Sequence, residues 1–119
     1  MFKAVALLKA RPGISREQFV EYYEKHHVPL ILRLMPQILD YRRNYVRTAD
    51  AYLAKDITAL DFDAVTELWY RSRADYESAA AVLRDAAVFQ QIADDEEHFL
   101  DRGKTRMFVV EEYVTQFGS

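Results

Sequence analysis

Four strand-like segments are marked by short runs of apolar residues that end at turn signals. Residues 2–10 form a nearly continuous apolar run that stops at residues 11–13, an Arg-Pro-Gly sequence typical of a turn. Residues 62–70 read as a strand with the same short apolar character. Two further segments rich in Val, Tyr, Phe or Ile predict the remaining strands, at residues 38–47 and 105–117.

A helical pattern occupies the stretch between the first two strands. It begins at Ser15, whose hydroxyl is expected to form a capping box with Gln18, and Pro36 ends it. Its apolar positions share one helical face and are Phe19, Tyr23, Leu30 and Leu34. Pro29 lacks an N–H and its ring crowds the carbonyl of Lys25, so we expect a kink in this helix.

A second helical region follows the strand at residues 62–70 and is broken once. Ser72 is expected to cap its start, Asp85 to begin a new helical stretch, and Arg102-Gly103 to stop it. The order strand-helix-strand-strand-helix-strand predicts an α+β fold of the ferredoxin-like type (βαββαβ), with a four-stranded antiparallel sheet and helices on one face. With 119 residues and no internal repeat, the chain is expected to form one domain, residues 1–119.

Large apolar side chains occur on both faces of the predicted sheet. In the last strand, Phe108 and Val110 have one parity, whereas Met107, Val109 and Tyr113 have the other. The helices cover one face only, and an exposed apolar face of this size is unusual for a soluble monomer. We therefore predict a homodimer in which two sheets pack face to face and enclose a pocket.

Composition and charge exclude several classes of function. The net charge is −3 and the lysines and arginines are scattered, so the chain lacks the basic footprint that nucleic-acid binding needs. The chain has no cysteine, which excludes disulfides, thiolate nucleophiles and cysteine metal sites. The apolar run at the N-terminus is too short to span a membrane and lacks the order of a signal peptide. We expect a cytoplasmic protein without nucleic-acid or membrane partners.

Two adjacent histidines, His26 and His27, are the first candidates for chemistry. Imidazole titrates near neutral pH, which suits a general acid or base. The axis of the apolar stripe falls about midway between the two side chains at about 100° per residue, so periodicity does not decide which one faces inward. The inward imidazole is either a proton carrier in a pocket or a hydrogen-bonded side chain of the core.

Glu67 and Trp69 lie two residues apart on one face of their strand. If that face lines a dimer cavity, Glu67 is a buried carboxylate with a raised pKa and carries a proton. The alternative is a partly wet face on which Glu67 pairs with Arg43 or Arg71. Tyrosine hydroxyls that could bind a ligand oxygen come from Tyr41, Tyr45, Tyr70 and Tyr113.

The acidic run at residues 94–97 is predicted to be a solvated helix face, with Phe99 turned inward. Asp95 and His98 share a helical face, but two ligands are too few for a metal site. We therefore predict no metal site and no cofactor.

Three segments, taken together, resemble the EthD family. Residues 18–30 resemble its first-helix signature, in which aromatic positions precede His-Ala-Pro-Leu; the match assigns the family's histidine to His27, with Val28 at the alanine. Residues 62–69 resemble its third strand, which ends in Glu-Leu-Trp. Residues 95–101 resemble its Asp-Glu-x-x-Phe-x-Asp element.

The resemblance implies a dimeric α+β barrel, a group whose relatives include lactone isomerases, polyketide cyclases and dehydratases, cofactor-free monooxygenases and haem-handling enzymes. We expect an enzyme without a cofactor that isomerises, cyclises or dehydrates an apolar cyclic, aromatic or polyketide-like metabolite. Its catalytic residues are expected to be His27 and Glu67, and its substrate-binding residues His26, Tyr41, Tyr45, Trp69 and Tyr113. The alternatives are an oxygen- or haem-dependent barrel with His27 as axial ligand, and a non-catalytic dimer that binds a metabolite.

Overall fold

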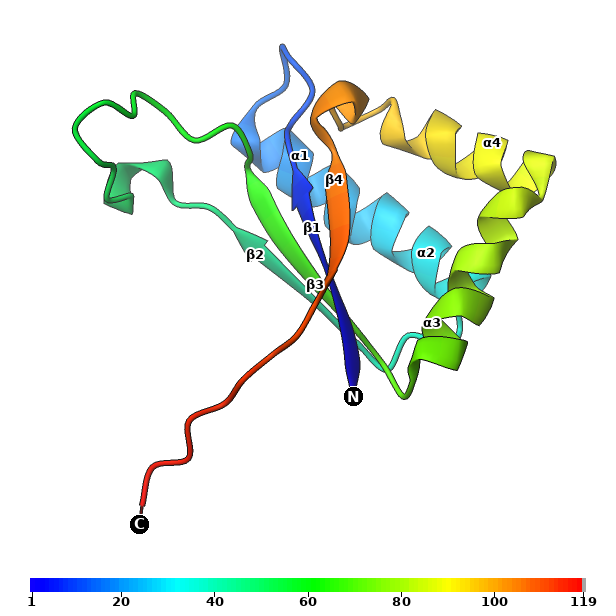
Figure 1. The fold of residues 1–119 in the computed structure, drawn as a ribbon. Coiled ribbons are helices and arrows are strands. Elements are labelled where there is room, and N and C mark those ends of the chain that lie inside the picture. Colours follow the sequence, from blue (N-terminus) through cyan, green and yellow to red (C-terminus); the bar gives the residue numbers. More distant parts are fainter. Residues whose placement is uncertain (119) are drawn as a thin grey trace.

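Four strands and several short helices make up the structure, a computed structural model that describes residues 1–118 (Figure 1). The strands are β1 (Phe2–Leu8), β2 (Asp40–Tyr45), β3 (Ala64–Tyr70) and β4 (Arg106–Val110). The α-helices are α1 (Arg16–Tyr22), α2 (Val28–Leu34), α3 (Arg73–Ala80) and α4 (Ala86–Glu96). The shorter helical turns are η1 (Tyr23–His27), η2 (Thr48–Asp50), η3 (Ala81–Arg84) and η4 (Arg102–Lys104).

The strands form one antiparallel sheet in the order β2-β3-β1-β4. β1 is central and pairs along its whole length with β3, from Phe2↔Tyr70 to Leu8↔Ala64, and on its other side with β4. The two helical regions follow β1 and β3, as the sequence pattern predicted. The predicted α+β, ferredoxin-like βαββαβ fold is therefore confirmed.

Alternate residues of the two central strands build the core on the helix-covered face of the sheet. The buried positions of these strands are Ala4, Ala6, Leu8, Ala64, Thr66, Leu68 and Tyr70. Three of them are alanines, which let the aromatic side chains of the helices approach the sheet closely. Phe19, Tyr23 and Phe99 are the largest fully buried side chains, and their rings contact one another at centroid separations of 5.3–6.2 Å.

The first helical region begins as predicted and changes its winding at the histidines. The Ser15 hydroxyl accepts from the Gln18 N–H and the Gln18 side chain accepts from the Ser15 N–H, which completes the capping box. Between α1 and α2, η1 winds as a π-helix, and the Val28 N–H donates to the Tyr23 carbonyl five residues back. The expected disturbance by Pro29 is thus a wide turn placed just before the proline. The wide turn lets Tyr23 and His27 both face the sheet.

The second helical region has the two predicted caps. The Ser72 side chain accepts from the Asp75 N–H at the start of α3, and the Asp85 side chain accepts from two N–H groups at the start of α4. No helix in residues 1–118 combines the length and the apolar character that crossing a membrane requires.

The last strand is shorter than predicted. The sequence pattern predicted a strand over residues 105–117, but β4 ends at Val110. Val110 pairs with Lys3, and β1 begins at Phe2, so no neighbouring strand extends far enough to pair with the following residues. Residues 111–118 leave the sheet as an extended arm (red in Figure 1) on which Tyr113 and Phe117 are 90% and 88% exposed.

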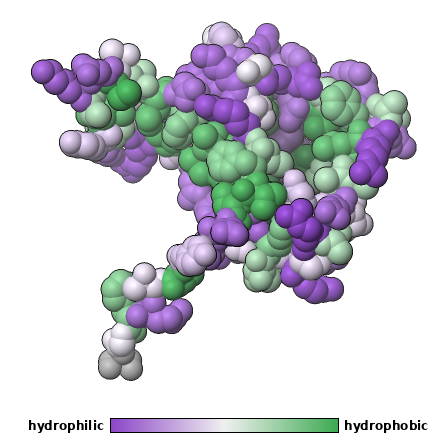
Figure 2. Space-filling view, viewed as in Figure 1, coloured by the Kyte–Doolittle hydropathy of each residue, from purple (hydrophilic) through white to green (hydrophobic). Residues whose placement is uncertain are grey.

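The face of the sheet opposite the helices is of mixed character. Its apolar side chains, from the strand register, are Val5, Leu7, Val65, Trp69, Phe108 and Val110. Charged and polar side chains lie among them, chiefly Lys3, Arg42, Asn44 and Glu67. Figure 2 shows apolar side chains gathered in the middle of the molecule around β4, where Phe108 is 44% exposed. The predicted apolar face is therefore present mainly at the β4 side of the sheet.

Candidate functional site

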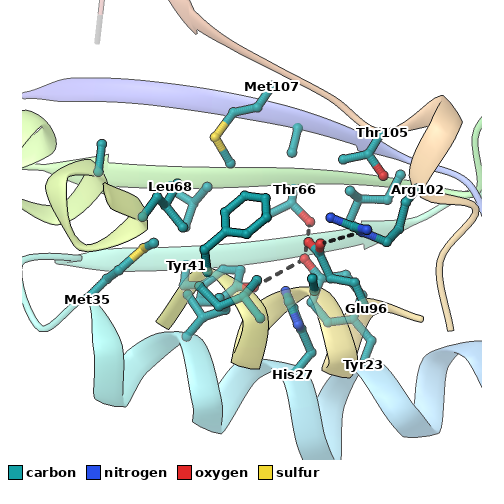
Figure 3. A pocket seen from close by; sticks show the side chains of 18 of the residues that line it. Tyr23, His27, Met35, Tyr41, Thr66, Leu68, Glu96, Arg102, Thr105 and Met107 are labelled. Carbon is teal, nitrogen blue, oxygen red and sulfur yellow. Dashed lines mark hydrogen bonds and ion pairs between the residues drawn. The ribbon is translucent and has the colours of Figure 1, made fainter. Parts of the chain in front are cut away.

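A pocket of about 260 Å³ lies between the covered face of the sheet and the helices (Figure 3). Side chains from β1, β2, β3 and β4 form one wall, and residues of η1, α2, α3 and α4 form the other. This pocket lies within a single chain, on the face of the sheet opposite the one where the sequence predicted a hollow between two chains. Apolar groups dominate one end, among them Ile31, Met35, Leu68, Tyr76 and Leu83.

His27 is the central polar group of the pocket. The side chain lines the pocket and the residue is only 6% exposed. Its Nδ1 lies 2.7 Å from Oδ2 of Asp95, and the Tyr22 hydroxyl donates to the other carboxylate oxygen, Oδ1, over 2.8 Å. Because a carboxylate accepts, Nδ1 is the donor of this hydrogen bond, so in the neutral form of the imidazole the lone pair lies on Nε2. Asp95 therefore holds the imidazole in one orientation.

A carboxylate and a guanidinium stand beside this imidazole. Glu96 and Arg102 both line the pocket, and Arg102 Nε lies 3.2 Å from Glu96 Oε1. Burial raises the pKa of Glu96, and the charges of His27 and Arg102 oppose that rise. Figure 3 places these side chains together with Thr105 at one end of the pocket, away from Met35 and Leu68.

A chain of hydroxyl groups completes the polar wall. The Tyr41 hydroxyl donates to the Tyr23 hydroxyl over 3.2 Å, and the Tyr23 hydroxyl lies 2.6 Å from Thr66 Oγ1. Burial raises the pKa of Tyr23 and raises that of Tyr41 well above the usual value, so both stay neutral donors. If Tyr41 donates to Tyr23 and Tyr23 to Thr66, the Thr66 hydroxyl has its proton to offer to a ligand oxygen.

This arrangement can remove a proton from a bound molecule and stabilise the charge that results. An imidazole oriented by a carboxylate lines a mostly apolar pocket. Neutral hydroxyl donors stand on the neighbouring wall, where a developing oxyanion would be stabilised more strongly than in water.

Glu67 and Trp69 lie on the opposite face of the sheet from this pocket. Their positions in β3 alternate with the pocket residues Thr66 and Leu68. Glu67 pairs with Lys3 at 2.7 Å and accepts from Asn44, and these contacts lower its pKa, where a raised one was expected. Trp69 lies between two cations, with Lys3 Nζ 4.4 Å and Arg42 Cζ 4.7 Å from its ring centroid. Neither residue contacts the pocket that His27 lines.

Of the tyrosines singled out as possible ligand contacts, Tyr41 and Tyr70 line the pocket. His26 is exposed and stacks on Tyr22 at a centroid distance of 4.6 Å, so the structure resolves the choice between the two histidines: His27 faces inward. Tyr45 points to the covered side but donates to Glu24, away from the pocket. Tyr113 lies on the exposed arm.

The sequence-based argument missed the inward half of the acidic run. Asp94 and Glu97 are exposed as predicted, but Asp95 and Glu96 turn toward His27 and the pocket. Their spacing from apolar residues could have indicated this. Ile92 and Phe99, which are buried, lie three or four residues from Asp95 and Glu96, a spacing that places side chains on one helical face. His98 Nδ1 donates to the Asp94 carbonyl over 2.9 Å, and the side chain stays exposed.

Across residues 1–118, no group of three or more histidine, aspartate or glutamate side chains is placed to hold a metal ion. Asp95 is instead occupied by hydrogen bonds to His27 and Tyr22.

Comparisons with known proteins agree with this architecture. A sequence model of the EthD domain matches residues 11–103, which include both helical regions, β2 and β3. A search of curated proteins found no significant match.

Several solved structures have the same fold. A protein from Arabidopsis thaliana is 12% identical, has a TM-score of 0.64 and covers 98% of this chain and 100% of its own. An ethyl tert-butyl ether d (EthD) family protein from Bacillus halodurans is 18% identical, with a TM-score of 0.61 and coverages of 95% and 100%. A Bacteroides fragilis protein, described as dimeric with a ferredoxin-like fold and of unknown function, is 8% identical, with a TM-score of 0.56 and coverages of 93% and 95%.

Proposed function

This chain belongs to the EthD domain family, and we propose that it is an enzyme that moves a proton on a small apolar ring compound without a cofactor. The observation that carries this proposal is the placement of His27. Its imidazole is buried in an apolar pocket, its Nδ1 is held by Asp95, and its Nε2 is left as the base.

The reaction begins when His27 Nε2 removes a proton from a carbon next to a carbonyl group. The C–H bond breaks, its electron pair forms the enolate double bond, and the negative charge moves to the carbonyl oxygen. The hydroxyl chain of Tyr41, Tyr23 and Thr66 donates to that oxygen. Return of the proton at another carbon gives an isomer. Loss of a neighbouring hydroxyl group, with the proton delivered from the imidazolium, gives dehydration.

Proton transfer can be tested without knowledge of the natural substrate. The probe is 2-tetralone, a bicyclic ketone of suitable size for the pocket, incubated with the protein in D₂O while NMR follows loss of the α-proton signals. We expect exchange well above the buffer rate with the native chain. We expect His27→Gln to lower it by about 10²–10⁴-fold, the usual contribution of a general base.

His98→Gln is the matched control, because His98 is exposed and outside the pocket. Exchange should be unaffected in this variant. If His27→Gln exchanges the α-protons as fast as the native chain, His27 is not the base and the proposal fails.

We further propose that the protein works as a homodimer that associates through the face of the sheet opposite the helices. Support comes from the exposed apolar side chain of Phe108, which lies with Val110 on this face at the β4 side of the sheet, and from the dimeric state described for the Bacteroides fragilis structure. Sedimentation should give about twice the chain mass. Phe108→Arg should shift the protein to monomer, whereas Leu32→Arg, an exposed position on α2, should not. A monomeric native protein would contradict the proposal.

A further inference from the structure

We propose that this pocket selects neutral, oxygen-bearing ring compounds and discriminates against carboxylates, because Glu96 neutralises its cation. The inference rests on the proposed function for the identity of the site, but it concerns binding alone. It narrows the substrate to un-ionised ketones, phenols and alcohols with an apolar ring body.

The charges at the polar end carry the argument. Among the described residues that line the pocket, Arg102 is the one arginine or lysine side chain. Its Nε lies 3.2 Å from Glu96 Oε1, and its Nη1 lies 3.4 Å from Glu97 Oε1. One guanidinium therefore faces two carboxylates. A third carboxylate, Asp95, lies directly behind the imidazole of His27.

The two carboxylates on Arg102 differ in position. Glu96 lines the pocket and its side chain is 20% exposed, whereas Glu97 is outside the lining and 67% exposed. Solvent screens Glu97 strongly and Glu96 weakly. An anion at the polar end would thus meet a negative charge close by, with no spare positive charge to offset its loss of hydration.

A neutral oxygen avoids that penalty and finds partners. The hydroxyl chain ending at Thr66 and the imidazole of His27 offer hydrogen bonds to a carbonyl or hydroxyl group. The opposite end, with Ile31, Met35 and Leu68, offers only apolar contact. The pocket therefore matches a ring with one uncharged oxygen function directed at the polar end, where Thr66 can donate to it.

The test compares two probes of equal ring size, 2-naphthol and 2-naphthoate, by calorimetric titration at neutral pH, where the first is uncharged and the second is an anion. In the native protein, 2-naphthol should bind at least about tenfold more tightly than 2-naphthoate. In Glu96→Gln, the side chain keeps its size but loses its charge, so Arg102 gains a share of free positive charge. The preference should shrink by about tenfold or reverse.

Glu97→Gln is the matched control, because it removes the exposed carboxylate from the same guanidinium; the preference should stay within about twofold of the native value. Arg102→Gln provides a second variant should Glu96→Gln fail to fold, and it should weaken 2-naphthoate further while leaving 2-naphthol nearly unchanged. Three results would overturn the inference. The native protein binds 2-naphthoate as tightly as 2-naphthol or more tightly, it binds neither probe, or the preference for 2-naphthol is unchanged in Glu96→Gln. If the native protein shows the preference for 2-naphthol but does not exchange the α-protons of 2-tetralone, the proposed role of His27 fails and this inference stands.

Discussion

Replacing Asp95 with Asn tests how His27 is held in place. The Asp95 side chain is 13% exposed and accepts two hydrogen bonds, from His27 Nδ1 over 2.7 Å and from the Tyr22 hydroxyl over 2.8 Å. Each is a hydrogen bond to a charged acceptor, worth about 1.5–3 kcal/mol. The amide of Asn keeps one acceptor oxygen and turns an NH₂ group toward the other donor. The variant therefore retains about one neutral bond of roughly 1 kcal/mol, and we expect a net loss of about 2–5 kcal/mol.

The assay is urea unfolding followed by far-UV circular dichroism, with thermal unfolding as a second measurement. For a chain of this size, each kcal/mol lowers Tm by roughly 4 °C, so a decrease on the order of 10 °C is expected. Tyr22→Phe removes one donor but keeps the carboxylate, and it should cost about 1.5–3 kcal/mol. Asp94→Asn, at the exposed neighbouring position, should cost under about 0.5 kcal/mol.

The same variant has a spectroscopic signature. In the native protein, ¹⁵N NMR of the imidazole should report a protonated Nδ1 and an unprotonated Nε2, because Nδ1 faces the carboxylate. Asp95→Asn should populate the other tautomer as well. A loss of stability below about 0.5 kcal/mol together with an unchanged tautomer would refute the reasoning that Asp95 orients His27.

Two further predictions concern stability. Hydrogen bonds from Arg43 and Tyr45 lower the pKa of Glu24 below its unfolded value of 4.5. The contribution of Glu24 to the free energy of unfolding is therefore fully present above pH 4.5 and is lost as the pH falls through the lower folded pKa. In urea unfolding measured over the acid range, the free energy of unfolding should decline less with falling pH in Glu24→Gln than in the native chain. Phe99→Ala empties a site that is 0% exposed and should cost about 3–5 kcal/mol in urea unfolding, whereas Phe89→Ala, 49% exposed at the pocket, should cost under about 1 kcal/mol.

The fold was accessible from the sequence because its determinants are local. The capping residues Ser15, Ser72 and Asp85 each mark a helix start through hydrogen bonds to N–H groups two or three residues away. Strand parity is equally local, and it placed Thr66 and Leu68 on the face opposite Glu67. Such features need no knowledge of what packs against them.

The end of β4 could not be read in this way. Residues 105–117 have strand composition throughout, but pairing requires a neighbour, and β1 begins only one residue before Lys3, the partner of Val110. Composition indicates where a chain favours an extended backbone, whereas the length of the adjacent strand decides where the sheet stops. The same limit applies to η1, since a single wide turn is not visible in a repeat of 3.6 residues.

The candidate site was predicted only in part because it depends on contacts between distant segments. His27 and Asp95 are 68 residues apart and meet because α4 crosses the end of η1. The sequence singled out both residues but not their contact, and it predicted a cavity on the other face of β3, beside Glu67 and Trp69. It left Glu96 among the solvated residues, although Glu96 lines the pocket.

The position of the binding pocket can be measured directly by intermolecular NOEs between 2-naphthol and methyl groups of the protein. Binding between the sheet and the helices predicts contacts from the ring protons to Leu68 and Ile31. Contacts instead to Val5 and Val65, on the opposite face of the sheet, would contradict the account, because they would place the ligand away from His27.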